Sequence, residues 1–219
     1  AGGDITLDGP GNDFKGTVNA DGKNIVLTDV NDITLGNVSS GEDFQVTAGG
    51  DITQDNTAPN KIVVGGTTDL TAGGDITLDG PNNDFKGTVN ADGKNIVLTD
   101  VNDIKLGDVN SGEDFKVTAG GDIAQDNTAP NKIVVGGKTD LTAGGDITLD
   151  GPSNDFKGTV NARGKNVTLT DVNDIALGDV LVQEDFETSS GGSMTQDAGG
   201  GKKILVEGKT RLTAGKSIV

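Results

Sequence analysis

The 219-residue chain contains no cysteine, histidine, tryptophan or tyrosine, and its only arginines are Arg163 and Arg211. Without cysteine and histidine there is no disulfide bond, no thiolate or imidazole metal ligand, no thiol nucleophile and no histidine acid–base catalysis. No apolar run approaches the roughly 18 residues that a transmembrane helix needs, so we expect no membrane insertion.

Positive charge is also scarce, because 34 acidic residues stand against 17 basic ones and the net charge is −17. Nucleic acids and anionic membranes are bound largely through lysine and arginine, so we expect neither as a partner. Cations and neutral sugars remain possible partners.

Repetition dominates what the chain does contain. The phrase LTDVNDITLG, which begins at Leu27, recurs in variant form at intervals of 19, 24 and 28 residues, and the intervals then start again. The segment AGGDITLDGP accordingly begins at Ala1, Ala72 and Ala143. The sequence therefore divides into three units, 1–71, 72–142 and 143–219, of which the last diverges after residue 179.

Periods of this length indicate a solenoid. Each phrase alternates apolar and polar residues around a turn rich in Gly, Asn and Asp, which is typical of strand, turn and strand. The 36 glycines and the abundant Val, Ile and Thr disfavour helix. We predict an all-β fold, a right-handed parallel β-helix in which each interval is one coil of three strands and about eight to nine coils form one elongated rod.

Stacked coils place equivalent residues above one another, so the phrases predict a core ladder of Ile5, Ile33, Ile52, Ile76, Ile104, Ile123, Ile147, Ile175, Met194 and Ile218. The six phenylalanines are expected to fill coil corners, and the extra residues to lie in outward loops at 8–13, 19–24 and 55–60. Three glutamines occupy positions that the strand alternation predicts to point inward: Gln54, Gln125 and Gln196. Because an unpaired buried amide is costly, we expect them to lie near a corner or to pair with backbone groups.

A row of aspartates precedes these isoleucines: Asp4, Asp32, Asp51, Asp75, Asp103, Asp122, Asp146 and Asp174. Such a row either binds Ca²⁺ together with carbonyls of neighbouring coils or caps the amides of its own turns. We favour capping, because the row ends in Ser193 and Ser217, which cap well but coordinate Ca²⁺ poorly, and no nonapeptide or EF-hand Ca²⁺ motif is present. We therefore assign no catalytic, cofactor-binding or metal-ligating residue, and Ca²⁺ is the one cofactor left possible.

The units can be compared within this one chain. Units one and two differ at only seven positions, all predicted to lie in loops or to face outward. In unit three, Leu181 and Val182 replace Asn110 and Ser111 in a predicted turn. This divergence is either drift toward the next region of a longer solenoid or an exposed apolar binding patch.

The phrases LTAGGDITLDG, NDFKGTVN, NIVLTDVNDITLG and VTAGGDITQ cycle through essentially the whole chain. They resemble the repeats of filamentous-haemagglutinin-type adhesins, large secreted β-helical exoproteins of two-partner secretion in Gram-negative bacteria. The resemblance implies a right-handed β-helix, export by a dedicated outer-membrane secretion partner, and an extracellular position at the bacterial outer-membrane surface.

We therefore expect a structural and adhesive repeat segment of a large cell-surface or biofilm-matrix adhesin, a stiff rod excised from a longer solenoid. Its expected partners are cell-surface or matrix glycans and the neighbouring coils of the parent protein. The alternative is a carbohydrate-binding module that uses outward Thr, Asn and Asp columns or the divergent third unit. A polysaccharide lyase-like enzyme is disfavoured, because no acid–base cluster stands out from the repeats, and we expect no enzyme.

Overall fold

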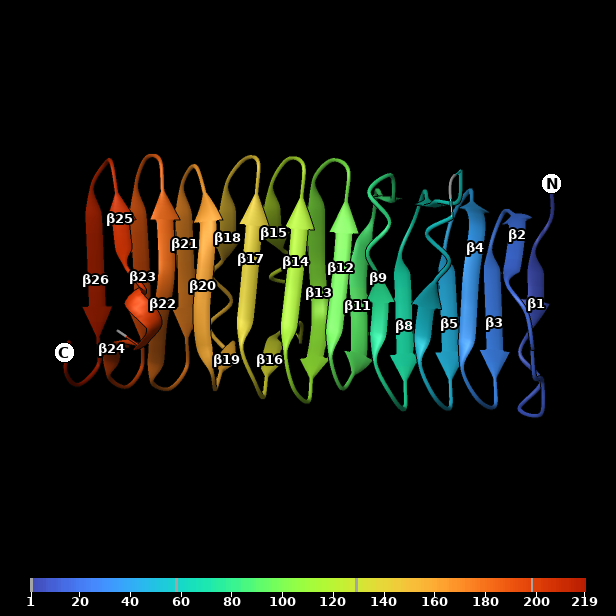
Figure 1. The fold of residues 1–219 in the computed structure, drawn as a ribbon, viewed down its shortest axis with the longest axis horizontal. Helices are drawn as coiled ribbons and strands as arrows, with labels where there is room; N and C mark the ends of the chain where they lie inside the picture. The colour runs from blue at the N-terminus through green and yellow to red at the C-terminus, as the bar shows by residue number, and fades with distance from the viewer. Residues whose placement is uncertain (1, 58, 129, 198) are drawn as a thin grey trace.

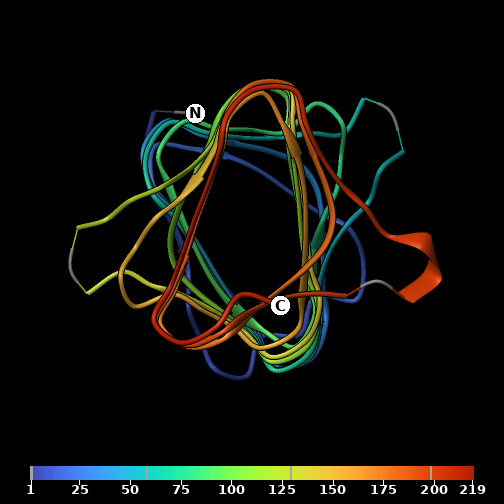
Figure 2. The same cartoon turned by 90° about the vertical axis from the view of Figure 1, so that its left-hand side faces the viewer.

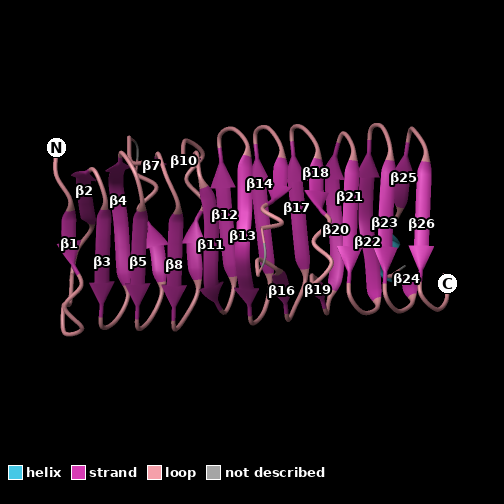
Figure 3. Ribbon diagram, turned by 180° about the vertical axis from the view of Figure 1, so that it is seen from behind, coloured by secondary structure: helices cyan, strands magenta, loops and turns pink. Residues whose placement is uncertain are grey.

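The computed structural model describes residues 2–57, 59–128, 130–197 and 199–219, and within them the chain forms 26 strands and one short 3₁₀ helix, η1 (Gly199–Gly201). The strands pair in parallel to form two 13-stranded sheets (Figures 1 and 3). No helix in this part of the chain has the length and apolar character needed to cross a membrane.

Sheet A consists of β1 (Ile5–Leu7), β3 (Ile25–Asp29), β5 (Phe44–Ala48), β8 (Thr68–Ala72), β11 (Thr88–Gly93), β13 (Ile104–Ser111), β15 (Ile123–Gln125), β16 (Ile133–Val135), β18 (Ile147–Leu149), β19 (Asp155–Phe156), β21 (Val167–Asp171), β23 (Phe186–Ser190) and β26 (Thr210–Ala214). Sheet B consists of β2 (Val18–Gly22), β4 (Ile33–Ser40), β6 (Ile52–Gln54), β7 (Ile62–Val64), β9 (Ile76–Leu78), β10 (Asp84–Phe85), β12 (Ile96–Asp100), β14 (Phe115–Ala119), β17 (Thr139–Ala143), β20 (Thr159–Gly164), β22 (Ile175–Val182), β24 (Met194–Gln196) and β25 (Ile204–Val206).

The chain winds as a β-solenoid because strands that follow one another along the sequence generally alternate between the two sheets (Figure 2). The main path of each sheet joins eleven strands, which gives about ten coils and a rod of roughly 48 Å at the usual strand spacing. The predicted all-β solenoid is confirmed, with slightly more coils than the eight to nine expected.

The number of strands per coil varies. The coil from Phe44 to Thr67 holds three strands, β5, β6 and β7, as predicted. In the preceding coil, two of these segments are fused into the single eight-residue strand β4, which pairs with both β6 and β7. Three strands per coil is therefore right only where a loop separates the second segment from the third.

The predicted isoleucine ladder breaks at each of its three 28-residue steps, where Ile5 pairs with Ile25 and Ile147 with Val167, whereas its other steps pair as predicted. Ile33, Ile52 and Ile76 do pair in sequence, but Ile76 then pairs with Ile96 and not with Ile104. Ile104 lies half a coil further on and begins β13 in sheet A, whereas its equivalent Ile33 begins β4 in sheet B. The 28-residue interval is thus about a coil and a half, and a 71-residue unit completes about three and a half coils.

Equivalent elements of successive units consequently change sheets. β7 belongs to sheet B, its equivalent β16 to sheet A and the next equivalent, β25, to sheet B again. Figure 2 shows the connections β6–β7 and β24–β25 projecting on one side of the rod and β15–β16 on the other.

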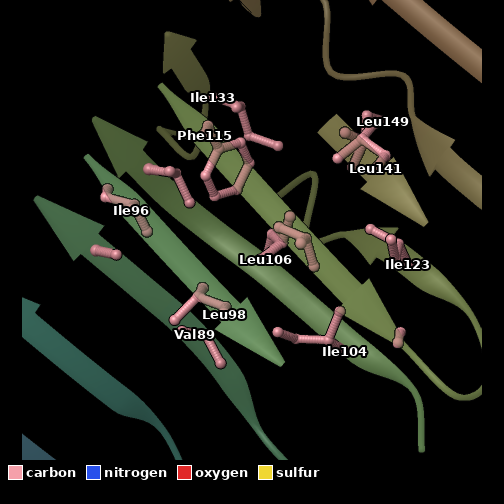
Figure 4. Close-up of a cluster of buried hydrophobic side chains, with 14 of the residues drawn as sticks. Val89, Ile96, Leu98, Ile104, Leu106, Phe115, Ile123, Ile133, Leu141 and Leu149 are labelled. Carbon is pink, nitrogen blue, oxygen red and sulfur yellow. The ribbon is translucent and has the colours of Figure 1, made fainter. Parts of the chain in front are cut away.

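The core is a continuous column of inward side chains between the sheets. Alternation along each strand buries residues such as Ile104, Leu106, Phe115 and Ile123 (Figure 4), and each fully buried side chain of this kind contributes about 1.5–3 kcal/mol. Five phenylalanines are fully buried, and Phe14 is half-buried. None of the seven positions that differ between units one and two is buried in either unit, as the sequence predicts.

Two loop predictions are wrong. Segment 19–24 is not an outward loop, because Asn19 to Gly22 lies in β2. Leu181 and Val182 do not lie in a turn either, since both belong to β22 and Val182 is buried. Ser111, the equivalent of Val182, is equally buried, so the strand continues through this position in both units. In the 55–60 loop, residue 58 lies outside the described residues.

Candidate functional site

Aspartate and asparagine side chains form hydrogen-bonded ladders along both turns of the coil. Asp32 Oδ1 accepts the backbone N–H of Asp51 at 2.8 Å, and Asp51 Oδ1 accepts that of Asp75 at 2.8 Å. The two longest ladders run through Asp32, Asp51, Asp75, Asn95, Asp114 and Lys138, and through Asp103, Asp122, Asp146, Asn166, Asp185 and Lys209. The aspartates therefore cap amides of the next coil and not, as predicted, those of their own turn.

The ladder explains the glycine that precedes many of these aspartates. A Cβ at Gly121 would lie 1.9 Å from Asp103 Oδ1, and one at Gly50 would lie 1.9 Å from Asp32 Oδ1. The backbone can approach the carboxylate of the coil below only without a side chain. Within the described residues, no group of three or more His, Cys, Asp or Glu is placed to hold a metal ion.

A pair of amides anchors two of the projecting loops, β6–β7 and β15–β16. Gln54 Nε2 donates to Asn83 Oδ1 at 2.8 Å, and Asn83 Nδ2 donates to Gln54 Oε1 at 2.7 Å. The same two oxygens also accept the backbone N–H groups of Ile62 and Gly80. Gln125 and Asn154 repeat the arrangement. The predicted backbone pairing is thus confirmed for these two glutamines, whereas Gln196 is exposed.

Buried aspartates close the loops that precede β10 and β19. Asp100 Oδ2 accepts the N–H of Phe85 at 2.8 Å, and its Oδ1 accepts the N–H of Asn102 at 2.7 Å. Burial raises the pKa of the Asp100 carboxyl above its ordinary value of 3.8, although these two hydrogen bonds act in the opposite direction. Burial likewise raises the pKa of Asp171. Both carboxylates accept two backbone N–H groups each.

Two equivalent surface grooves lie across the strands where a bulge bends them. The first groove, of about 200 Å³, crosses β8, β11 and β13, and is lined by Asp69, Leu70, Thr71, Asn90, Ala91, Asp92, Asp108 and Asn110. The second groove, of about 560 Å³, crosses β14, β17, β20 and β22, and is lined by Lys116, Lys138, Asp140, Leu141, Thr142, Asn161, Ala162, Arg163, Asp179, Leu181, Lys202 and Lys203. All eight positions of the first groove recur one unit later in the second, six of them with the same residue.

An inserted asparagine shapes each groove. Asn161 Nδ2 donates to Asp140 Oδ1 at 2.8 Å, while Asn161 Oδ1 accepts the N–H of Asp179 at 2.7 Å. A Cβ at Gly178 would lie 2.2 Å from Asn161 Oδ1, so glycine is required at the bulge. Asn90 makes the equivalent bonds in the first groove.

The grooves share this frame but differ in charge. The first groove is lined by three aspartates and no cation, whereas the second has five cations against two aspartates. At the centre, Arg163 replaces Asp92. Sequence reasoning missed this site, although alignment of the units shows the exchange; what it could not show is that the surrounding strands bring four further lysines to the same place.

The family described as repeats of unknown function (DUF5649) matches residues 1–21, 22–92, 93–163 and 164–219. Neither the curated proteins nor the solved structures compared with the chain give a match. The matched segments together span all 219 residues, and the two internal ones have the 71-residue length of the sequence unit. The chain is therefore a member of this family of repeats of unknown function.

Proposed function

We propose that the chain is a stiff structural and adhesive segment of a large bacterial surface or biofilm-matrix adhesin, with a mechanical and not a catalytic role. The observation that carries the proposal is the uninterrupted stacking of coils, in which paired strands, a continuous apolar core and the aspartate ladders join every coil to the next. Such an assembly lengthens by the addition of units and resists bending at each junction.

The proposed location is outside the cell, at the bacterial outer-membrane surface, after export by an outer-membrane secretion partner. Its support is the resemblance of the repeat phrases to filamentous-haemagglutinin-type adhesins and the absence of cysteine, which suits passage of an unfolded chain through a pore.

Small-angle X-ray scattering tests the rod. We compare the chain with a version that contains two additional copies of residues 72–142, and with a control that carries a Gly/Ser-rich insert of equal length. Two units amount to about seven coils, so the maximum dimension should increase by roughly 34 Å. The flexible control should instead show the scattering of a rod with a disordered segment. An increase well below that value, or cross-sectional growth, would contradict the proposal.

A second proposed role is carbohydrate binding on the solenoid surface. The specific observation in its favour is the second groove, which is open and polar and lies within the roughly 300–1,000 Å³ typical of ligand sites.

A further inference from the structure

We propose that the second groove binds an acidic oligosaccharide, a short polyuronate, through Lys116, Arg163 and Lys203. This inference rests on the carbohydrate-binding role above and specifies the ligand class. It begins from a local charge opposite in sign to that of the whole chain, whose net charge is −17.

The cations are arranged along the rod axis. Lys116 pairs with Asp140 in the next strand, and Asp140 pairs with Asn161. Asp179 then accepts the backbone N–H of Lys203. Lys116 and Lys203 consequently stand at the two ends of a row that spans five strand layers, or roughly 19 Å.

Arg163 lies at the centre of the neighbouring row. It pairs with Thr142 on one side and with Leu181 on the other. Each coil advances the groove by about 4.8 Å, close to the length of one sugar residue in an extended polysaccharide. Charged side chains at both ends and in the middle therefore match carboxylates that recur along a polyuronate, and the planar guanidinium of Arg163 can bind one of them through two hydrogen bonds.

Three of the five cations are free to bind a ligand. Lys138 is paired with Asp140 at 2.7 Å, and Lys202 is paired with Asp197. Lys116, Arg163 and Lys203 have no ion-pair partner among the described residues, and all three are exposed. The two acidic side chains of the groove already accept hydrogen bonds, Asp140 from Asn161 Nδ2 and Asp179 from the Lys203 N–H. They therefore compete only weakly with a ligand for the three free cations.

The floor suits a sugar ring. The half-buried Leu181 provides apolar surface for the C–H face of a pyranose, and the hydroxyl of exposed Thr142 is available to sugar hydroxyls. A thin oligosaccharide can contact this groove alone. A second copy of the chain would bring a large acidic surface against another, which like-charge repulsion opposes.

The first groove shows that the cations are not needed for folding. Four of their positions carry no positive charge one unit earlier, where Gln45, Thr67, Asp92 and Asn131 stand in place of Lys116, Lys138, Arg163 and Lys202. Lys203 alone keeps its counterpart, Lys132. The same backbone frame therefore tolerates either charge, and the chain itself supplies a matched control.

Calorimetric titration of the purified chain tests the inference, with an oligogalacturonate of about five sugars as probe and its neutral methyl ester for comparison. The groove variant carries the residues of the first groove: Lys116→Gln, Lys138→Thr, Arg163→Asp and Lys202→Asn. The four changes lower the net charge by five units, because Arg163→Asp counts twice. A control variant lowers it by the same amount elsewhere, with glutamine in place of Lys15, Lys23, Lys61, Lys86 and Lys94.

We expect one acidic oligosaccharide per chain, bound at least about tenfold more weakly by the groove variant and with little change by the control. Binding should weaken as salt is raised, because exposed charges are screened. Installing the four cations in the first groove, by Gln45→Lys, Thr67→Lys, Asp92→Arg and Asn131→Lys, should give a second site. Circular dichroism and melting temperature confirm that the variants are folded.

Equal binding of acid and ester would overturn the acidic ligand class while leaving carbohydrate binding in place. No binding of either probe would overturn both. Preference for a sulfated oligosaccharide would overturn the choice of a polyuronate, and so would sedimentation showing that the groove variant loses self-association, since a second copy would then occupy the groove. The scattering test of the rod is independent of all these outcomes.

Discussion

Thr188 places a hydroxyl in the core without a partner. Its side chain is fully buried, and its Oγ1 has no hydrogen-bond partner among the described residues. Its neighbours in the adjacent strands are Leu169 and Leu212, both apolar. At the equivalent positions of the first two units stand Val46 and Val117, which have the same shape without the hydroxyl. Thr188→Val should therefore stabilise the chain.

The expected gain follows from the cost of an unsatisfied buried hydroxyl. Mutational data place that cost at about 1–3 kcal/mol, and we expect about 1–2 kcal/mol because the packing volume is unchanged. For a chain of this size the gain corresponds to roughly 2–8 °C in melting temperature. Scanning calorimetry measures the shift, and hydrogen exchange around β23 tests whether the gain is local, since solenoids can unfold in parts.

The reverse change provides the control. Val117→Thr introduces the same hydroxyl at the same place one unit earlier, so it should lower the melting temperature by a similar amount. If Thr188→Val left stability unchanged or reduced it while Val117→Thr had no effect, the reasoning from the buried hydroxyl would be refuted.

Three further predictions concern the turns and loops. Gly121→Ala should lower the free energy of unfolding in urea by about 1–3 kcal/mol, because the new Cβ meets Asp103 Oδ1. In a double-mutant cycle, Asp103→Ala should relieve part of this cost; if the effects of the two substitutions were simply additive, the clash would be contradicted. Gln125→Ala should cost about 1–3 kcal/mol by breaking a buried amide pair, whereas exposed Gln196→Ala should stay within about 0.5 kcal/mol. NMR titration should give the Asp100 carboxyl a pKa above 3.8, and a pKa below 3.8 would contradict the reasoning. Its contribution to stability should therefore decrease as the pH rises from about 3.8 through the folded-state pKa, and stay constant above that pKa.

The sequence was sufficient to predict the solenoid and the direction in which side chains point. Strand alternation and turn residues act locally, so they can be read from the phrases. The stacking order could not be read in the same way. Ile96, in the phrase NIVLTD, stacks on Ile76 of DITLD because stacking needs only the same alternation and a capping oxygen at the corner. In this step Asp75 Oδ1 supplies the oxygen, and in the next step Asn95 Oδ1 accepts the N–H of Asp114, so an asparagine serves as well as an aspartate.

The groove was unpredictable for a related reason. Arg163 and Lys116 are 47 residues apart in the sequence. They line the same groove because their strands, β20 and β14, are only two layers apart along the rod. Counting coils correctly is therefore a precondition for finding the site. If the 28-residue interval is counted as one coil, these two side chains are assigned to the wrong layers of the rod.

The half-coil left over in each unit determines how a long array of such units meets its surroundings. Because β7, β16 and β25 switch sheets from one unit to the next, the translational repeat of the rod is two units and not one. A surface feature present in every unit would therefore alternate between the two sheets, and so between opposite sides of the rod. Such a filament cannot lie flat with all its contacts on one surface; it is suited to bridging two surfaces, or to joining neighbours on both sides within a mesh.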